Sequence, residues 1–352
     1  MSAVIDRDPR IAHQDIGGPA QPLLSVRGLV KHFPLKRDPL SRRQGGNAVR
    51  AVDGVDFDIK KGETLGVVGE SGCGKSTTAR LVMQLIMQDR GELVFDGVAV
   101  GSRALALREF RRQTQMVFQD SYSSLNPRMT IEDSIAFGPL VHGSGKHDAI
   151  AVARGLLGRV GLDAQRFAGR YPHELSGGQR QRVNIARALA LHPRLVILDE
   201  AVSALDKSVE AQVLNLLLDL KDDFGLTYMF ISHDLNVVRY ISDRVMVMYL
   251  GEVVELGPVD QVFDAPRHPY TQALLRSMPS MEPGVRTEVA PLSGDPPNPI
   301  DPPSGCRFHT RCAQARAACA AQAPAMTQQD GHAVRCLIHQ PESGYAASGA
   351  LA

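Results

Sequence analysis

The stretch that most constrains this chain is residues 65–77, LGVVGESGCGKST. A short apolar run, Leu65–Val68, leads into Gly69-x4-Gly74-Lys75-Ser76, and apolar residues at helical spacing follow. The order strand, glycine loop and helix is the context that a phosphate-binding loop needs. Glycines let successive N–H groups point at one anion, and the N-terminus of the helix adds partial positive charge. The stretch therefore predicts a site for a nucleoside triphosphate.

The residues of this loop have separate expected roles. Lys75 can reach the β- and γ-phosphates, and the Ser76 hydroxyl is placed to ligate Mg²⁺. The alternative is a glycine-rich turn without a ligand, which the complete spacing and the Lys-Ser pair disfavour. The expected ATP-binding residues of the loop are Gly69, Glu70, Ser71, Gly72, Cys73, Gly74, Lys75, Ser76 and Thr77.

Length and composition set the broad class of the chain. With 352 residues, 43% of them hydrophobic and 22% charged, it can form two domains and a sizeable core. A net charge of +1 gives no electrostatic case for a nucleic-acid partner. Apolar runs fall short of the roughly 18–20 residues that span a bilayer, and the N-terminus lacks the apolar core of a signal peptide. Any role at a membrane is expected to be peripheral.

The order of elements predicts an α/β fold with a distinct tail. Strands are expected at Leu24–Phe33 and Val49–Ile59, with a loop at 34–47 between them, and a helix is expected at His147–Val160. The chain becomes proline-rich after residue 279, too much so for helix or inner strand. The expected parts are a disordered lead (1–22), a nucleotide-binding domain (23–278) with a helical subdomain at about 120–180, and a linker with a cysteine-containing module (279–352).

A second motif narrows the family. Leu175-Ser176-Gly177-Gly178-Gln179 resembles the signature sequence of the ABC (ATP-binding cassette) ATPases, and residues 23–275 as a whole are similar to that family. A hydroxyl, exposed N–H groups and a helix start make this motif another anion site, although a merely capped helix is the plain alternative. The resemblance implies an ABC-type P-loop ATPase core with an antiparallel β subdomain and a helical subdomain, followed by a small cysteine- and proline-rich module.

The resemblance also assigns roles to single residues. Asp199, which ends an apolar run, looks like the Walker B carboxylate that helps to hold Mg²⁺, and Glu200 looks like the general base. Gln119 resembles the Q-loop glutamine that can touch Mg²⁺ or water, and His233 resembles the switch histidine. Asp206 belongs to a stretch similar to the D-loop. Phe33 is the expected aromatic residue for stacking on adenine, with a core or hinge role as the alternative.

The two phosphate-binding motifs imply a dimer. In this family, the signature of one subunit (here Ser176, Gly177, Gly178 and Gln179) closes over the ATP held by the phosphate loop of its partner. The chain carries one set of motifs, so a second ABC ATPase subunit is expected, as a heterodimer. Two transmembrane permease subunits and an extracytoplasmic solute-binding protein complete the importer that the resemblance implies, and the chain is expected at the cytoplasmic face of a bacterial inner membrane.

The tail suggests the branch of the family. Residues 267–275, RHPYTQALL, resemble the C-terminal motif of dipeptide and oligopeptide permease ATPases, as do SYSSLNP at 121–127 and LGEVVELG at 250–257. ATP-driven peptide import is therefore expected, and the loop sequence looks more like the second of the two ATPases of such importers. The same branch includes importers of nickel complexes, glutathione and opines. Alternatives from other classes are an export ATPase and a soluble ABC ATPase in translation or DNA repair.

Four of the five cysteines lie near the C-terminus: Cys306, Cys312, Cys319 and Cys336. Their irregular spacing fits no C-x2-C zinc ribbon, but four thiolates can ligate a [4Fe–4S] cluster without a fixed repeat. Resemblance to peptide permease ATPases with the same tail favours this cluster, with zinc and unliganded or disulfide-bonded cysteines as alternatives. A structural role is favoured over redox chemistry.

Overall fold

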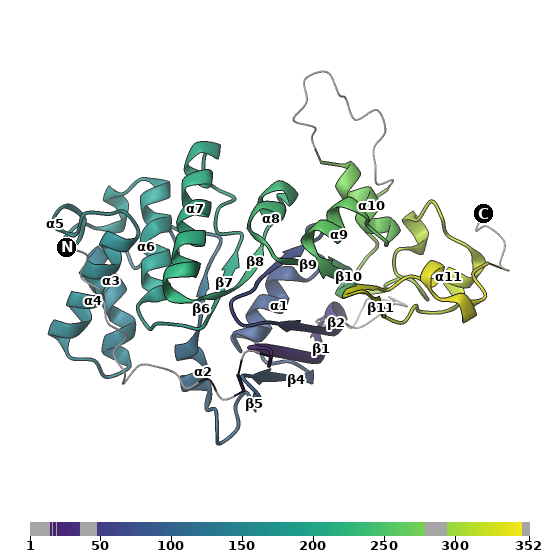
Figure 1. The fold of residues 1–352 in the computed structure, drawn as a ribbon, viewed down its shortest axis with the longest axis horizontal. Coiled ribbons are helices and arrows are strands. Elements are labelled where there is room, and N and C mark those ends of the chain that lie inside the picture. Colours follow the sequence, from purple (N-terminus) through teal and green to yellow (C-terminus); the bar gives the residue numbers. More distant parts are fainter. Residues whose placement is uncertain (1–14, 16, 19, 36–47, 279–293, 347–352) are drawn as a thin grey trace, which may run out of the picture. The chain divides into compact units, whose positions relative to one another are not determined.

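The computed structural model of the chain describes residues 15, 17–18, 20–35, 48–278 and 294–346 (Figure 1). Most of the expected lead and of the expected 34–47 loop, and residues 279–293 of the linker, lie outside these residues. The contacts divide the chain into two units. The helical unit consists of Met1–Ser25, Asp58–Glu63 and Leu93–Met229, and the loop unit consists of Val26–Phe57, Thr64–Glu92 and Phe230–Ala352. The domain bounds drawn from the sequence stay a prediction.

The sheet of the loop unit carries the phosphate loop. Strand β3 (Thr64–Val68) is buried at every residue and runs parallel to β9 (Arg244–Tyr249). Strands buried on both faces read as continuous apolar runs, and this explains the sequence of Leu65–Val68. The order is β11-β12-β10-β9-β3, and the last three strands of the chain pair antiparallel: β10 (Glu252–Pro258), β11 (Thr327–Gln329) and β12 (His332–Val334).

Short helices complete the loop unit. Helix α1 (Lys75–Val82) follows the phosphate loop, and α8 (Leu235–Ile241) packs on β3. The C-terminal part contains α9 (Val259–Asp264), α10 (Pro269–Arg276), α11 (Ala317–Ala321) and the 3₁₀ turns η2 (His309–Arg311), η3 (Leu337–His339) and η4 (Pro341–Ser343).

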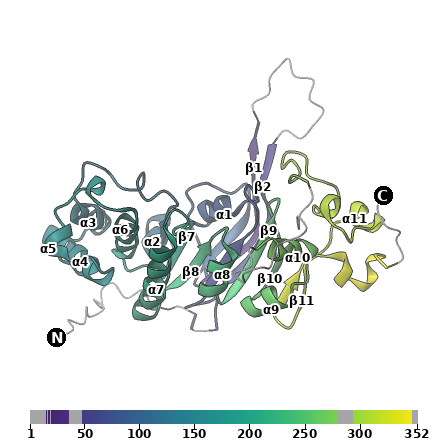
Figure 2. The same ribbon diagram turned by 90° about the horizontal axis from the view of Figure 1, so that it is seen from above.

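The first strands of the chain form a second sheet. In the loop unit β1 (Leu24–Pro34) lies between β2 (Ala48–Ile59) and β4 (Arg90–Phe95), and Figure 2 shows β1 and β2 side by side. Both predicted strands are therefore confirmed within one residue at each end. The end of β4 belongs to the helical unit, where it pairs antiparallel with β5 (Val98–Ala99).

One strand of the helical unit ends at the candidate carboxylates Asp199 and Glu200. Strand β7 (Leu195–Asp199) is buried at all five residues and runs parallel to β6 (Thr114–Val117), and the start of β8 (Thr227–Ile231) neighbours β7. The apolar run that predicted this strand thus places Asp199 at its carboxyl end.

Helices make up the rest of the helical unit. The predicted amphipathic helix is α4 (Lys146–Arg159), which packs on α3 (Ile131–Val141) and α6 (Gly177–Leu189). Figure 1 shows the three helices grouped together. The other helices are α2 (Leu107–Gln113), α5 (Ala164–Phe167) and α7 (Lys207–Phe224). The predicted α/β class is confirmed. Among the described residues, every helix is too short or too polar to cross a bilayer.

Candidate functional site

The phosphate loop, Gly69–Thr77, curls between β3 and α1 through backbone conformations that favour glycine. Gly69 has φ 148°, and a Cβ atom there would lie 2.2 Å from the Met248 carbonyl oxygen. Gly74 has φ 108°, and its Cβ atom would lie 2.4 Å from the carbonyl oxygen of Ala51. Side chains at these positions would clash with backbone that cannot yield. The loop geometry therefore depends on glycine at both places.

Lys75 begins α1 and folds back over the loop. Its side chain is buried, and Nζ donates to the carbonyl oxygens of Gly69 (2.7 Å) and Glu70 (3.0 Å). A buried ammonium group held by the backbone of the loop is the local positive charge that an anionic ligand needs. Cys73 beside it is buried, and burial raises the pKa of its thiol, so this cysteine is an inert packing group.

The helical unit brings two of the predicted residues together. Gln119 Nε2 donates to Glu200 Oε2 at 2.9 Å, and Asp199, immediately before Glu200, is buried at the end of β7. Glu200 adopts φ 49°, which is uncommon for a residue with a side chain and is typical of functional sites. The Ser203 hydroxyl and N–H both donate to the Glu200 carbonyl oxygen, so the following turn fixes this conformation.

The signature turn, Ser176–Gln179, starts α6. Ser176 Oγ accepts from the Gln179 N–H at 3.3 Å, and Gln179 Oε1 accepts from the Ser176 N–H at 3.0 Å. This reciprocal pair is a capping box, so the plain alternative of a capped helix describes the turn in this chain. Gly178 packs closely, because a Cβ atom there would lie 2.5 Å from Val209 Cγ1. Any anion bound here has to use donors outside the box.

The remaining predicted residues lie apart from one another. His233, in the loop unit, is exposed between β8 and α8, and Asp234 after it caps α8. Phe33 is 36% exposed near the end of β1, as a base-stacking ring requires. Asp206 is the N-cap residue of α7, although its side chain makes no capping hydrogen bond. Ser76 and Thr77 lie half-buried in the first turn of α1.

The loop has partners that the sequence did not predict. Nη1 and Nη2 of Arg311 donate to the Glu70 carboxylate, and the Glu70 N–H donates to the Tyr270 hydroxyl. Tyr270 belongs to the HPYTQALL stretch, so that stretch was the only available signal. The same C-terminal segment places Arg307 against Asp53 and Glu252.

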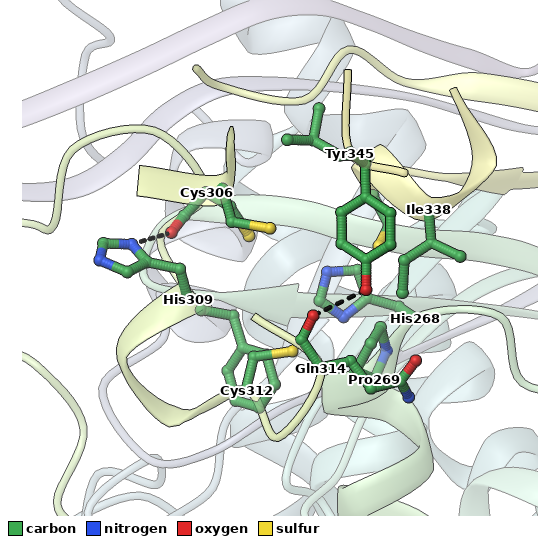
Figure 3. Close-up of a pocket in the computed structure, with 12 residues that line it drawn as sticks. His268, Pro269, Cys306, His309, Cys312, Gln314, Ile338 and Tyr345 are labelled. Carbon is green, nitrogen blue, oxygen red and sulfur yellow. Dashed lines mark hydrogen bonds between the residues drawn. The ribbon is translucent and has the colours of Figure 1, made fainter. Parts of the chain in front are cut away.

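The expectation of an iron–sulfur cluster is wrong. The four C-terminal cysteines line one pocket (Figure 3), but the described residues contain no group of three or more Cys, His, Asp or Glu side chains that could hold a metal. The pocket encloses about 10 Å³, room for one water at most. Burial raises the pKa of Cys306 to about 11 and of Cys336 to about 12, and it raises that of Cys312 as well. Burial thus disfavours the thiolate form of these three cysteines, which is the form that a metal binds. All four are free cysteines.

Comparisons with known proteins place the chain among transporter ATPases. The ABC transporter family matches residues 52–203, and the family described as "Oligopeptide/dipeptide transporter, C-terminal region" matches residues 254–319. The chain is 48% identical to the oligopeptide transport ATP-binding protein AppF of Bacillus subtilis, over 90% of this chain and 97% of AppF. It is 47% identical to the dipeptide transport ATP-binding protein DppF of Escherichia coli, over 92% of this chain and 96% of DppF.

Solved structures agree with this placement. The chain is similar to cbiO1 of Clostridium perfringens, part of the ABC transporter complex cbiONQ, with a TM-score of 0.59, 26% identity and coverage of 69% of this chain and 91% of that one. A dimeric ATP-binding cassette, MJ0796, bound to ADP and Pi matches with a TM-score of 0.57, 27% identity and coverage of 67% and 98%.

Proposed function

The chain belongs to the ATP-binding subunits of the ABC transporter family, and we propose how its residues hydrolyse ATP to drive the import of peptides. It is the ATPase subunit of a peptide importer, which works with permease partners and a solute-binding protein. The observation that carries this conclusion is the near-complete alignment with oligopeptide and dipeptide transport subunits, including the separate C-terminal region. An export ATPase or a soluble ABC ATPase would not account for that region.

The phosphate loop holds the triphosphate in this proposal. The N–H groups of the loop and the Lys75 ammonium group face the phosphates, and Lys75 exchanges its two carbonyl contacts for phosphate oxygens when ATP enters. Phe33, exposed on β1, stacks on the adenine ring.

Mg²⁺ fits the proposed donors. The Ser76 hydroxyl, the buried Asp199 carboxylate and the Gln119 amide oxygen are hard oxygen ligands of the kind that this ion takes. When bound, Mg²⁺ neutralises charge on the β- and γ-phosphates. The part that this chain contributes is a carboxylate fixed at the end of a buried strand.

Glu200 is the proposed general base. The Gln119 amide N–H holds one carboxylate oxygen at 2.9 Å, and the strained backbone of Glu200 is fixed by Ser203, so the carboxylate has a defined direction. Glu200 accepts a proton from the attacking water, while His233 contacts the γ-phosphate and Asp206 contributes through the D-loop.

The expected partners follow from the separate roles of the phosphate loop and the signature turn. We infer that the signature turn (Ser176, Gly177, Gly178 and Gln179) closes the site of a second ABC ATPase subunit, in a heterodimer. Two permease subunits and an extracytoplasmic solute-binding protein would complete the transporter at the cytoplasmic face of the bacterial inner membrane. The segment 119–129 is a suitable permease contact, because the Asn184 side chain of α6 donates to the Ser121 carbonyl oxygen and so links this segment to the signature helix.

One experiment tests both hydrolysis and cargo. Glu200→Gln in the complete transporter, assembled in membrane vesicles, should retain ATP binding but lose turnover by about a thousandfold, because no base remains to activate water. Uptake of labelled di- and oligopeptides should stop with it. Parental turnover in this variant would remove Glu200 from the role of base. Parental vesicles that accumulate nickel complexes, glutathione or opines but no peptides would shift the cargo to the other members of the branch.

A further inference from the structure

An acidic side chain stands where the protein is expected to bind an anion. Glu70 is the second residue of the phosphate loop, and its side chain is 21% exposed. A carboxylate in this position repels a triphosphate through the partly desolvated surroundings of the loop. The loop therefore needs a compensating positive charge that remains in place when ATP is bound.

Arg311 supplies that charge from the far end of the chain. It lies in the turn η2, between Cys306 and Cys312, and its side chain is only 5% exposed. Nη1 and Nη2 contact the two carboxylate oxygens of Glu70 at 2.7 and 3.0 Å. Planar two-point contact of this kind is stronger and more directional than a single ion pair.

Tyr270 fixes the backbone of the same residue. Its hydroxyl accepts from the Glu70 N–H at 2.9 Å, and the residue is fully buried. Its ring lies 4.6 Å from the Tyr249 ring and 5.4 Å from the Phe308 ring, between centroids, so the hydroxyl has little freedom. The start of α10 is itself fixed, because the buried Glu255 carboxylate accepts from the N–H groups of Arg267 and His268.

Every polar group of Glu70 thus has a partner. Arg311 takes the carboxylate, Tyr270 takes the N–H, and Lys75 donates to the carbonyl oxygen at 3.0 Å. The segment Pro296–Pro299 also lines a cavity of about 210 Å³ with the residues of the loop from Glu70 to Cys73, and it is tied to β2 by the Arg50 N–H on the Pro299 carbonyl oxygen. The C-terminal region contacts the outside of the phosphate loop at several independent points.

We propose that Arg311 and Tyr270 are positioning residues for nucleotide binding, which set the charge and conformation of the phosphate loop through Glu70. The proposal rests on the assignment of the phosphate loop as the triphosphate site. Arg311 neutralises the carboxylate and Tyr270 orients its peptide group. The C-terminal module of this chain is in this way a part of the nucleotide site.

A double-mutant cycle in the full chain tests the proposal. Arg311→Gln should raise the Kd for a fluorescent ATP analogue about tenfold, because an unpaired carboxylate then faces the phosphates. In the Glu70→Gln background the same change should cost at most about twofold, since no carboxylate is left to neutralise. Equal losses in both backgrounds would overturn the proposal. In the assembled transporter Arg311→Gln should raise KM for ATP and leave kcat unchanged.

Further variants separate this inference from the assignment beneath it. Tyr270→Phe should raise the Kd about threefold, because the Glu70 N–H loses its acceptor. Arg316→Gln makes the same change as Arg311→Gln in the same module, at a side chain that bonds the Tyr345 and Ala346 carbonyl oxygens, and should leave the Kd at the parental value. Parental affinity in Arg311→Gln together with lost binding in Lys75→Ala would overturn the positioning role alone. Parental affinity in Lys75→Ala would overturn the phosphate-loop assignment.

Discussion

The phosphate loop and the signature turn are both glycine-containing segments at helix starts, yet they are built differently. The phosphate loop uses positive φ angles at Gly69 and Gly74 and contains the buried ammonium group of Lys75. The signature turn contains no cation of its own. Its capping box already uses the N–H groups of Ser176 and Gln179, which donate to each other's side-chain oxygens. The first is therefore equipped to hold an anion alone. The second is suited to adding to an anion held by another surface, and this difference is the physical argument for the site shared between two subunits that we propose.

The largest effect on ATP binding should come from removing Lys75, the cation that the phosphate loop contains and the signature turn lacks. Lys75→Ala removes the buried ammonium group and should weaken ATP binding by about a hundredfold or more, as measured by equilibrium titration of the full chain. Lys207→Ala is the matched control, because Lys207 also begins a helix but has an exposed side chain, which pairs with Glu210. Its Kd should equal that of the parent. Similar losses in both variants would point to a general effect of charge.

Glycine should matter more at Gly74 of the phosphate loop than at Gly177 of the signature turn. Gly74→Ala forces a side chain into a backbone carbonyl oxygen at φ 108°, and should cost about 2–3 kcal/mol in the free energy of unfolding. At Gly177 the atom nearest to a new Cβ is Leu205 Cδ2 at 3.9 Å, so Gly177→Ala should leave stability within about 0.5 kcal/mol. Urea unfolding of both variants gives the comparison. A stable Gly74→Ala variant would show that the loop can rearrange.

These elements differ in how much of them the sequence could predict. The apolar runs that end at Val68 and Asp199 define buried strands, because a strand covered on both faces needs no polar residue. Gly74 and Ser176 could also be predicted, because each belongs to a motif whose residues lie close together along the chain. The contacts of Glu70 were not, since Tyr270 and Arg311 lie 200 and 241 residues away along the chain and only tertiary packing brings them to the loop.

The contacts of Glu70 were missed by the sequence analysis, whereas at the cysteines it predicted a ligand that the described part of the structure does not support. Similarity of the tail suggested a cluster, and the structure does place Cys306, Cys312, Cys319 and Cys336 around one pocket. What the sequence could not supply is the environment, because burial raises the pKa of Cys306 and Cys336 and the space among the side chains is small. Similarity of the tail could suggest that the cysteines lie together, whereas the pKa of a thiol depends on its solvation in the folded protein.

The signature turn should affect turnover without affecting binding. Ser176→Ala should leave the Kd of the isolated chain for ATP within about twofold, while ATPase activity of the assembled transporter falls about tenfold. Loss of the cap should also cost about 1 kcal/mol in stability. Thr130→Ala controls for that loss, because Thr130 caps α3 through the Asp133 N–H in the same unit. Equal turnover in the two variants would reduce the signature turn to a helix cap.

The smallest expected effect is on the free energy of unfolding at mildly acidic pH. It concerns the helix caps next to the two sites, at the start of α6 and of α10. The capping box of Ser176 and Gln179 does not titrate, whereas α10, which carries Tyr270, is capped by His268 Nδ1 accepting from the Tyr270 N–H. That contact needs a neutral ring. Burial lowers the pKa of His268 to about 4, against a favourable contribution from Glu255, and nearby His339 lowers it further.

The sign follows from the two states. Above about pH 6.5 the ring is neutral in both, so His268 adds no pH dependence. Below that value His268 takes up a proton in the unfolded chain but not in the folded chain. The free energy of unfolding therefore falls, by about 1 kcal/mol at pH 6. Burial acts to raise the pKa of Glu255, but hydrogen bonds from His332 and other groups outweigh it, and the pKa is lowered. The contribution of Glu255 to stability is therefore lost only at more acidic pH.

Urea unfolding at pH 8, 7 and 6 measures this loss. His268→Asn keeps a side-chain acceptor for the Tyr270 N–H that cannot take up a proton. We expect the variant to lose less stability than the parent between pH 7 and pH 6, by the contribution of one histidine. Equal pH dependence in the two proteins would show that the cap of α10 does not depend on a neutral His268. A smaller loss in His268→Asn would show that the start of α10, which carries Tyr270, is stabilised by a group sensitive to pH, unlike the capping box of the signature turn.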